Sequence, residues 1–121
     1  MEATECGAAS LGIVLAHYGR WVSLEELRDA CGISRDGSSG RMVAQAASEY
    51  GLTVRALKAE PGTLKSLALP LIVFWRFNHF LVVEGWSPSG WHLNDPAVGR
   101  RVCTDAEFDE AFTGVVLELT P

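Results

Sequence analysis

The first part of the chain carries the residue pattern of helices. After Cys6 the residues are mostly apolar or small, which predicts a largely buried helix that starts at or just before Cys6 and ends at Gly19. Ser23, followed three residues later by Glu26, is a capping box and predicts a short second helix that ends at Gly32. Both elements come before any segment with β character.

A third helix is predicted for residues 40–50. Its apolar positions recur at a spacing that places them on one side of a helix, and they are Met42, Val43, Ala46, Ala47 and Tyr50. Gly51 follows directly and is well placed to end the helix in the left-handed conformation. Helical patterns therefore fill the chain up to this glycine.

From residue 52 onward β-strand patterns take over. The predicted strands are 53–57, 71–75, 80–84, 91–94, 100–103 and 114–119. Short turns join the second strand to the third and the fourth to the fifth, so we expect two antiparallel hairpins. Residues 61–67 are expected to form a helical turn, and Thr104 with Glu107 is a second capping box, for a helix through Phe112. This order predicts an α+β fold class, with N-terminal helices packed on a C-terminal antiparallel β-sheet.

Size and charge narrow the class of protein. The chain has 121 residues, 48% of them hydrophobic, so we expect one domain over 1–121 with a full core. Its net charge of -5 argues against a nucleic acid partner, because such proteins concentrate Lys and Arg. The longest apolar stretches, 11–16 and 67–75, fall short of the roughly 20 residues that span a bilayer.

The cysteines do not form a recognisable disulfide or metal pattern. Cys6, Cys31 and Cys103 cannot all pair within the chain, and no two cysteines have CxxC spacing. The histidines add no standard ligand spacing, so we expect no metal and no cofactor. These features favour a reducing compartment. Cys31 and Cys103 lie late in a predicted helix and at a strand end, which is typical of packing residues.

Cys6 is the candidate nucleophile. It lies at the predicted start of a helix, where backbone N–H groups and the positive end of the helix dipole favour a thiolate. Gly7 removes a side chain beside the sulfur and would let a substrate backbone approach closely. Because cysteine is among the most buried residue types, a packing role for Cys6 stays open on this local pattern.

His79 is the candidate general base among three histidines. It follows Asn78 and starts the most apolar strand, a rigid platform for a catalytic side chain. His17 lies on the last turn of the first helix, too far along to reach back to Cys6, and is expected at the surface. His92 is expected to face solvent from its strand. A structural role for His79 remains an alternative at this point.

Asp95 completes a possible catalytic group. An Asp before Pro is most often a turn former, and that reading also stays open. Cysteine at a helix start, then histidine, then a carboxylate on later β elements is, however, the layout of papain-like thiol hydrolases. In that layout the imidazole takes the thiol proton, and the carboxylate orients the imidazole.

A family resemblance rests on six segments in chain order, namely Met1-Glu2-Ala3-Thr4-Glu5-Cys6-Gly7-Ala8-Ala9-Ser10, Tyr18-Gly19, Ser34-Arg35-Asp36-Gly37, Asn78-His79-Phe80, Asn94-Asp95-Pro96 and Phe112-Thr113-Gly114-Val115. Along essentially its whole length the chain resembles the C39 peptidases, the N-terminal domains of bacterial ABC transporters that process and export bacteriocins and related peptides. The resemblance implies a papain-like cysteine peptidase fold. It also implies that Cys6 is the nucleophile, His79 the general base and Asp95 the orienting residue.

The resemblance further implies a substrate and a setting. The substrate is a precursor peptide, cut after a Gly-Gly or Gly-Ala pair at the end of its leader. The partners are the transmembrane and ATP-binding domains of an ABC transporter, with the domain on the cytoplasmic side of the bacterial membrane and soluble when isolated. We expect Gly7, Trp75, Phe77 and Asn78 to contribute to substrate binding, and an apolar groove to hold the amphipathic leader helix.

One departure concerns the oxyanion hole. The family places a glutamine six residues before the nucleophile, a position that falls immediately before Met1. Either the sequence begins one residue too late, or the protein relies on the backbone N–H of Cys6 and the helix N-terminus alone. Loss of one oxyanion donor typically costs about 100- to 1,000-fold in turnover, so an added N-terminal Gln is expected to raise the rate.

Two other functions remain as alternatives to a peptidase. A C39-like domain that has lost catalysis can bind the leader without cutting it, although such domains typically lose the cysteine. A transglutaminase or acyltransferase would use the same Cys-His-Asp chemistry and differ in its product, an amine adduct in place of a free acid.

Overall fold

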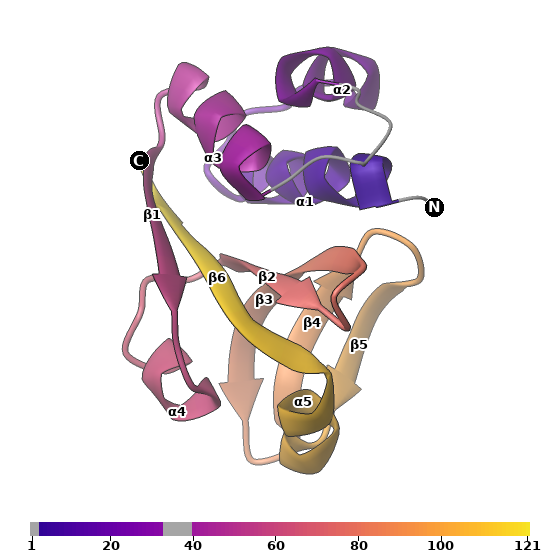
Figure 1. Cartoon of the computed structure of the whole chain (residues 1–121), viewed down its shortest axis with the longest axis vertical. Coiled ribbons are helices and arrows are strands. Elements are labelled where there is room, and N and C mark those ends of the chain that lie inside the picture. The colour runs from indigo at the N-terminus through magenta and orange to yellow at the C-terminus, as the bar shows by residue number, and fades with distance from the viewer. Residues whose placement is uncertain (1–2, 33–39) are drawn as a thin grey trace.

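The computed structural model describes residues 3–32 and 40–121, without the side chains of residues 3 and 4. In this part of the chain three helices precede a six-stranded sheet, and two further helices lie between its strands (Figure 1). The segment 34–37, one of those that carry the resemblance, lies outside the described residues. The helices are α1 (Ala3–His17), α2 (Leu24–Cys31), α3 (Gly40–Glu49), α4 (Pro61–Leu64) and α5 (Asp105–Ala111). The strands are β1 (Thr53–Lys58), β2 (Leu71–Trp75), β3 (His79–Ser87), β4 (Gly90–Asp95), β5 (Gly99–Cys103) and β6 (Phe112–Thr120).

The helix ends follow the predicted capping residues. Ser23 Oγ accepts a hydrogen bond from the Glu26 backbone N–H at 3.2 Å, and Gly32 ends α2 with a φ of 76°. The Glu26 carboxylate accepts a hydrogen bond from the hydroxyl of Tyr50, the residue directly after α3, which links α2 to the end of α3. At α5 both bonds of the predicted capping box are present. The five helices predicted from the sequence are thus confirmed.

The six strands form one antiparallel sheet in the order β1-β6-β2-β3-β4-β5. The two predicted hairpins, β2 with β3 and β4 with β5, are present. The last strand, β6, lies between β1 and β2 and pairs with both. It therefore links β1, which follows the first three helices, to the rest of the sheet. The predicted α+β arrangement, helices on an antiparallel sheet, is confirmed. No helix in the described part of the chain is long and apolar enough to span a bilayer.

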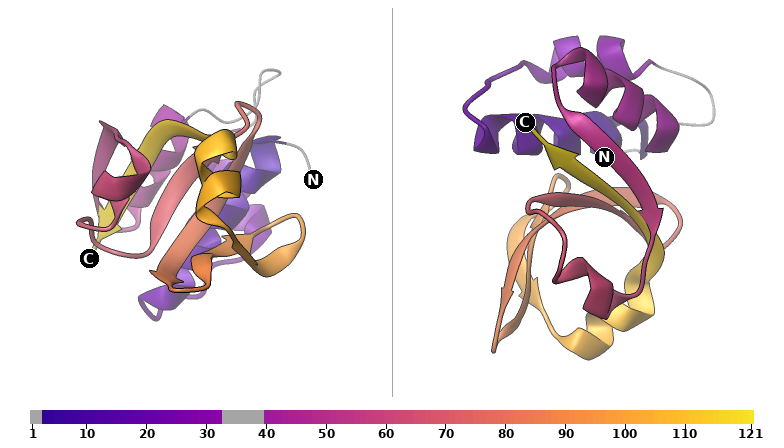
Figure 2. Two further views of the ribbon diagram at one scale, coloured as in Figure 1. Left: turned by 90° about the horizontal axis from the view of Figure 1, so that it is seen from below. Right: turned by 90° about the vertical axis from the view of Figure 1, so that its left-hand side faces the viewer.

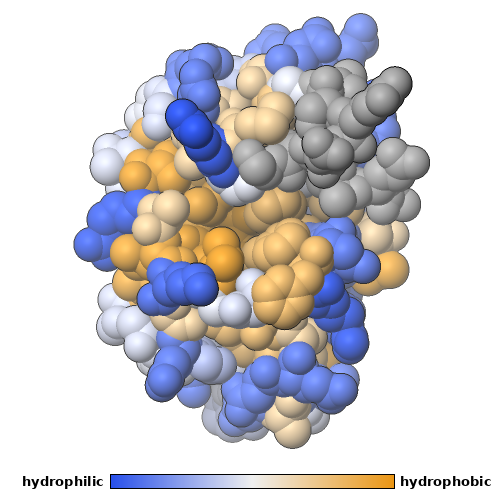
Figure 3. Space-filling view, in the orientation of Figure 1, coloured by the Kyte–Doolittle hydropathy of each residue, from blue (hydrophilic) through white to orange (hydrophobic). Residues whose placement is uncertain are grey.

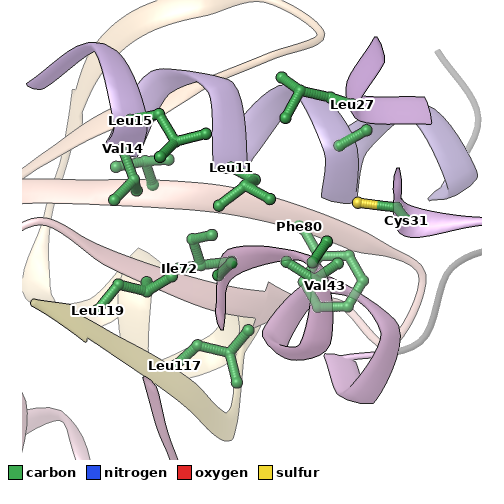
Figure 4. Packing of buried hydrophobic residues seen from close by; sticks show 14 of the residues in the cluster. Leu11, Val14, Leu15, Leu27, Cys31, Val43, Ile72, Phe80, Leu117 and Leu119 are labelled. Atoms are coloured by element: carbon green, nitrogen blue, oxygen red, sulfur yellow. The ribbon is translucent and has the colours of Figure 1, made fainter. Parts of the chain in front are cut away.

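The sheet is curved, and each of its faces is covered (Figure 2). One cluster of buried side chains lies between α1, α2, α3 and the sheet, and includes Leu11, Val43, Ile72 and Phe80 (Figure 4). A second cluster on the other face brings residues of α4 and α5 against the strands. Cys31 is buried in the first cluster and Cys103 in the second, as expected of packing residues. The catalytic candidates lie where the helical layer meets one end of this sheet.

Candidate active site

Cys6 lies in the first turn of α1 and points into the molecule. The described helix begins at Ala3, three residues earlier than the cysteine, so Cys6 is inside the helix and not at its cap. Its relative exposure is 0%, and its Sγ lies 2.7 Å from His79 Nδ1. α1 packs along β3, which brings residues 73 positions apart in the sequence into contact.

His79 is the first residue of β3 and is positioned by the β2–β3 hairpin. It pairs with Trp75 across a turn in which Arg76 and Phe77 both have positive φ, 52° and 59°. The imidazole side chain is 16% exposed. Its Nε2 lies 2.6 Å from Asp95 Oδ1, so the ring bridges the thiol and the carboxylate.

Asp95 ends β4 and serves two groups at once. Its Oδ1 accepts a hydrogen bond from the Ala97 backbone N–H at 2.9 Å in addition to its contact with His79. The contacts expected of a turn former and of an orienting carboxylate are therefore both present in this one side chain. Asp95 is buried, and its Oδ2 lies 3.9 Å from a guanidinium nitrogen of Arg101.

The environment of the Cys6 thiol opposes ionisation in the resting chain. Burial raises the pKa of the Cys6 thiol, and the Phe80 backbone N–H partly offsets this by hydrogen bonding to the sulfur. The negative charge of Asp95 raises the same pKa further. The helix N-terminus alone therefore does not set the protonation of Cys6, contrary to the simplest expectation from its place on α1. A thiol with a raised pKa needs a base to ionise, and His79 Nδ1 is the ring nitrogen in contact with the Cys6 sulfur.

A cleft of about 520 Å³ opens beside the imidazole and the carboxylate. Its lining residues are Trp75, Arg76, Asn78, His79, Asp95, Ala97, Val98 and Arg101. Two predicted substrate contacts, Trp75 and Asn78, line it, whereas Phe77 is 75% exposed outside the lining and Gly7 is buried beside Cys6.

Arg101 was not among the residues singled out from the sequence. Its guanidinium lies over the Trp75 ring, 5.7 Å from the ring centre, and beside Asp95. An arginine on a short strand gives no signal of its own. The predicted hairpin could have revealed it, because the pairing of Asp95 with Gly99 places residue 101 on the same face as Asp95.

The remaining histidines do not join this group. His17 is exposed and makes an edge contact with the Tyr18 ring. His92 is half-buried, and its Nε2 lies 2.7 Å from Ser87 Oγ. The structure thus brings together Cys6, His79 and Asp95 and leaves the other two histidines elsewhere.

A buried thiol, an imidazole and a carboxylate in series, with the thiol on a helix and the other two groups on an antiparallel sheet, define the class of papain-like thiol hydrolases. Comparison with known proteins identifies the family within this class. The model of the peptidase C39 family matches residues 1–121. The chain belongs to the peptidase C39 family and is a cysteine peptidase domain.

Two relatives illustrate the match. The chain is 35% identical over 120 residues to the colicin V secretion/processing ATP-binding protein CvaB of Escherichia coli, with 99% of this chain and 17% of the relative covered. It is 30% identical over 129 residues to the transport/processing ATP-binding protein ComA of Streptococcus pneumoniae, with 100% of this chain and 18% of the relative covered. The chain therefore spans less than a fifth of the length of these curated relatives.

Solved structures agree with the fold. A double glycine motif protease from an AMS/PCAT transporter, solved in complex with the leader peptide, is 48% identical with a TM-score of 0.94, covering 100% of this chain and 87% of that one. The peptidase domain of Streptococcus ComA is 28% identical with a TM-score of 0.91, covering 100% of this chain and 94% of that one. The expected papain-like α+β fold is thereby confirmed.

Proposed function

We propose that this chain is a cysteine endopeptidase that removes the leader of a precursor peptide by cutting after a double-glycine pair. The observation that carries this proposal is the continuous contact from Cys6 Sγ through the His79 ring to Asp95, at 2.7 Å and 2.6 Å. The likeness to a double glycine motif protease solved with a leader peptide supports the choice of substrate.

The contacts suggest how each residue acts. Asp95 accepts the Nε2–H of His79, which leaves the Nδ1 lone pair directed at the thiol. His79 takes the thiol proton, and the Cys6 sulfur attacks the carbonyl of the second glycine to form a tetrahedral intermediate. The backbone N–H of Cys6 stabilises the oxyanion. The intermediate collapses to a thioester as His79 returns the proton to the leaving amine, and water then hydrolyses the thioester to a free acid.

The burial of the nucleophile supports a preference for glycine. Cys6 is fully buried and Gly7 beside it is also buried, so little space surrounds the sulfur. A peptide without side chains at the scissile pair can bring its carbonyl to such a sulfur, whereas a larger residue would meet the walls. A Gly-Ala pair adds only one methyl group, the smallest side chain, and is therefore proposed as a cleavage site beside Gly-Gly.

The leader and the transporter complete the proposal. On the face that carries α3, β1 and β6, apolar side chains gather between the helical layer and the sheet (Figure 3), a surface suited to an amphipathic leader helix. The curated relatives are transport and processing ATP-binding proteins more than five times as long as the matched region. We infer that this domain works with the transmembrane and ATP-binding domains of an ABC transporter, on the cytoplasmic side of the bacterial membrane.

Cleavage of a synthetic leader peptide tests the proposal. A peptide whose leader ends in Gly-Gly is incubated with the chain under reducing conditions, and the masses of the products are measured by mass spectrometry. We expect a free acid ending in Gly-Gly, and a loss of at least about 1,000-fold in rate for Cys6→Ala. Cys103→Ala, which removes a buried thiol from the second cluster, is the matched control and should keep its activity.

Two results would contradict the proposal. Binding of the leader peptide without any cut product, unaffected by Cys6→Ala, would identify a leader-binding domain. An adduct with an added amine in place of a free acid would identify a transferase.

A further inference from the structure

The cleft beside His79 carries an unusual charge for this chain. The whole sequence has a net charge of -5, yet the lining includes two arginines, Arg76 and Arg101. Asp95 is the one carboxylate among the described lining residues, and its oxygens already face His79, Ala97 and Arg101. The cleft therefore offers positive charge to whatever enters it.

Arg101 is held at the wall of this cleft. Its side chain is 37% exposed, and the guanidinium rests over the Trp75 ring with its nearest carboxylate oxygen, Asp95 Oδ2, at 3.9 Å. That distance is longer than a direct hydrogen bond, so the donors of the guanidinium fork are not saturated by Asp95. The stacking on Trp75 limits the freedom of the side chain and keeps its charge at the site.

Arg76 lies on a turn whose backbone would favour other residues. Both central residues, Arg76 and Phe77, have positive φ, a turn geometry that usually selects Asn-Gly. The turn is held by a hydrogen bond from the Arg76 N–H to the Ala111 carbonyl at 2.8 Å. Arginine in a left-handed conformation costs stability without improving the turn, and such strain clusters at functional sites. Among the described residues its guanidinium forms no ion pair.

The position of the cleft indicates which part of a substrate it receives. Its lining contains His79 and Asp95 but not Cys6. The leaving amine takes its proton from the His79 ring, so the segment downstream of the cut bond lies on the imidazole side of the site. The leader, upstream of the cut, ends at the sulfur.

We propose that this cleft binds the first residues downstream of the cleaved bond and prefers an acidic side chain there, through Arg76 and Arg101. The inference rests on the proposed peptidase function and adds a specificity to the downstream side. A carboxylate of the substrate would accept hydrogen bonds from the Arg101 fork and meet the Arg76 charge at the mouth of the cleft.

Three peptides test the preference. They share one leader ending in Gly-Gly and differ only in the two residues that follow, which are both Glu, both Gln or both Lys. We expect kcat/KM for the Glu peptide to exceed that for the Gln peptide about five-fold, and the Lys peptide to be cut more slowly than both, as for partly exposed ion pairs. The Glu preference should shrink at about 1 M salt, where charges are screened within about 3 Å.

Charge-removing variants identify the residues. Arg101→Gln should reduce the Glu-to-Gln ratio to about two or less, Arg101→Lys should keep part of it, and the variant with both Arg76→Gln and Arg101→Gln should bring the ratio to about one. Arg55→Gln is the matched control, because Arg55 lies on β1 at the far edge of the sheet. A ratio near one in the unchanged chain, or an unaltered ratio in the double variant, would overturn the inference. The ratio is insensitive to a general loss of activity, since both peptides share the same enzyme.

A binding measurement separates this inference from the proposed peptidase function. Calorimetry of the Cys6→Ala chain with the same three peptides should give the same order of Kd. If no peptide is cut by the unchanged chain but the Kd order holds, the peptidase proposal fails and the acidic subsite stands. If the peptides are cut but neither kcat/KM nor Kd distinguishes Glu from Gln, the subsite is refuted and the peptidase proposal stands.

Discussion

The Asp95 carboxylate holds a turn and an imidazole through the same oxygen atom. Oδ1 accepts from the Ala97 backbone N–H and faces His79 Nε2, while the chain after Asp95 turns toward Gly99 and returns as β5. Because the turn fixes the carboxylate and the carboxylate fixes the ring, the position of His79 depends on a local backbone feature.

Substitution of Asp95 separates these two tasks. Asp95→Asn keeps an amide oxygen that can accept both hydrogen bonds, so we expect kcat/KM to fall only about tenfold through the lost charge. Asp95→Ala removes both acceptors, and we expect a fall of roughly 100-fold or more, with a loss of stability of about 1–3 kcal/mol. Steady-state kinetics on a double-glycine peptide and urea unfolding measure the two effects.

The folded fraction of each variant is measured by fluorescence, and each rate is divided by it. A loss of stability is then not counted as a loss of activity. If Asp95→Asn and Asp95→Ala lose the same activity, the amide oxygen does not replace the carboxylate and charge is the dominant contribution. If neither loses activity, Asp95 is only a turn former.

At the scale of the elements, two cysteines occupy opposite ends of helices. Cys6 lies in the first turn of α1, and Cys31 is the last residue of α2. The positive end of a helix stabilises a thiolate, whereas the negative end opposes it. Burial raises the pKa of Cys31 to about 11, and the nearby Glu49 adds to the shift. Cys31 is therefore the less reactive of these two thiols, in agreement with a packing role.

The raised pKa of Cys31 predicts a loss of stability in alkali. The buried thiol keeps its proton up to about pH 11, whereas in the unfolded chain it ionises near its ordinary value of 9.0. The stabilisation is complete below pH 9.0 and disappears as the pH rises toward 11, at a rate on the order of 1 kcal/mol per pH unit. Urea unfolding at several pH values should show this decline, and Cys31→Ala should make it shallower.

The comparison uses the slope of the free energy of unfolding against pH and not its absolute value, because Cys31→Ala also leaves a cavity that lowers stability at every pH. Cys103→Ala provides the matched change in the other cluster, where burial also raises the pKa of the thiol. Parallel declines in Cys31→Ala and the unchanged chain would show that the Cys31 thiol is not the titrating group.

The elements also show what the sequence could predict and why. Helix ends depend on neighbouring residues, so Ser23, Gly32 and Thr104 located α2 and α5 from local pattern alone. The insertion of β6 beside β1, which pairs Thr53 with Thr120, depends on contacts between distant segments and left no local signal.

The candidate site also has features that the sequence predicts and features that depend on the folded structure. The residues of the proposed catalytic group could be named from the sequence because three reactive side chain types occur in a recognisable order, but their contact depends on α1 packing along β3. The raised pKa of the Cys6 thiol could not be read from its place on the helix, because burial is a property of the folded chain.

At the scale of the whole molecule, the proposed catalytic group is divided between two layers. Cys6 belongs to the helical layer, and His79 and Asp95 belong to the sheet. The 2.7 Å distance between Cys6 Sγ and His79 Nδ1 therefore depends on how α1 packs against the sheet. Leu11, fully buried on α1 in the first cluster, is one of the side chains that pack between α1 and the sheet (Figure 4).

Two leucine truncations test the coupling of this interface to catalysis. Leu11→Ala and Leu64→Ala each delete a fully buried side chain, one beneath α1 and one on α4 in the second cluster, and each should cost about 2–5 kcal/mol of stability. We expect Leu11→Ala to lower kcat/KM per folded molecule about tenfold or more, because a shift of about 1 Å in a reacting group can cost 100-fold. Leu64→Ala should stay within about twofold, since α4 lies on the opposite face of the sheet from α1. Kinetics at a temperature well below both unfolding midpoints, with the folded fraction measured by circular dichroism, provide the comparison. Equal losses of kcat/KM in both variants would mean that overall stability, and not the packing of α1 against the sheet, limits the reaction. A loss confined to Leu11→Ala would mean that the packing between the two layers controls the thiol–imidazole contact.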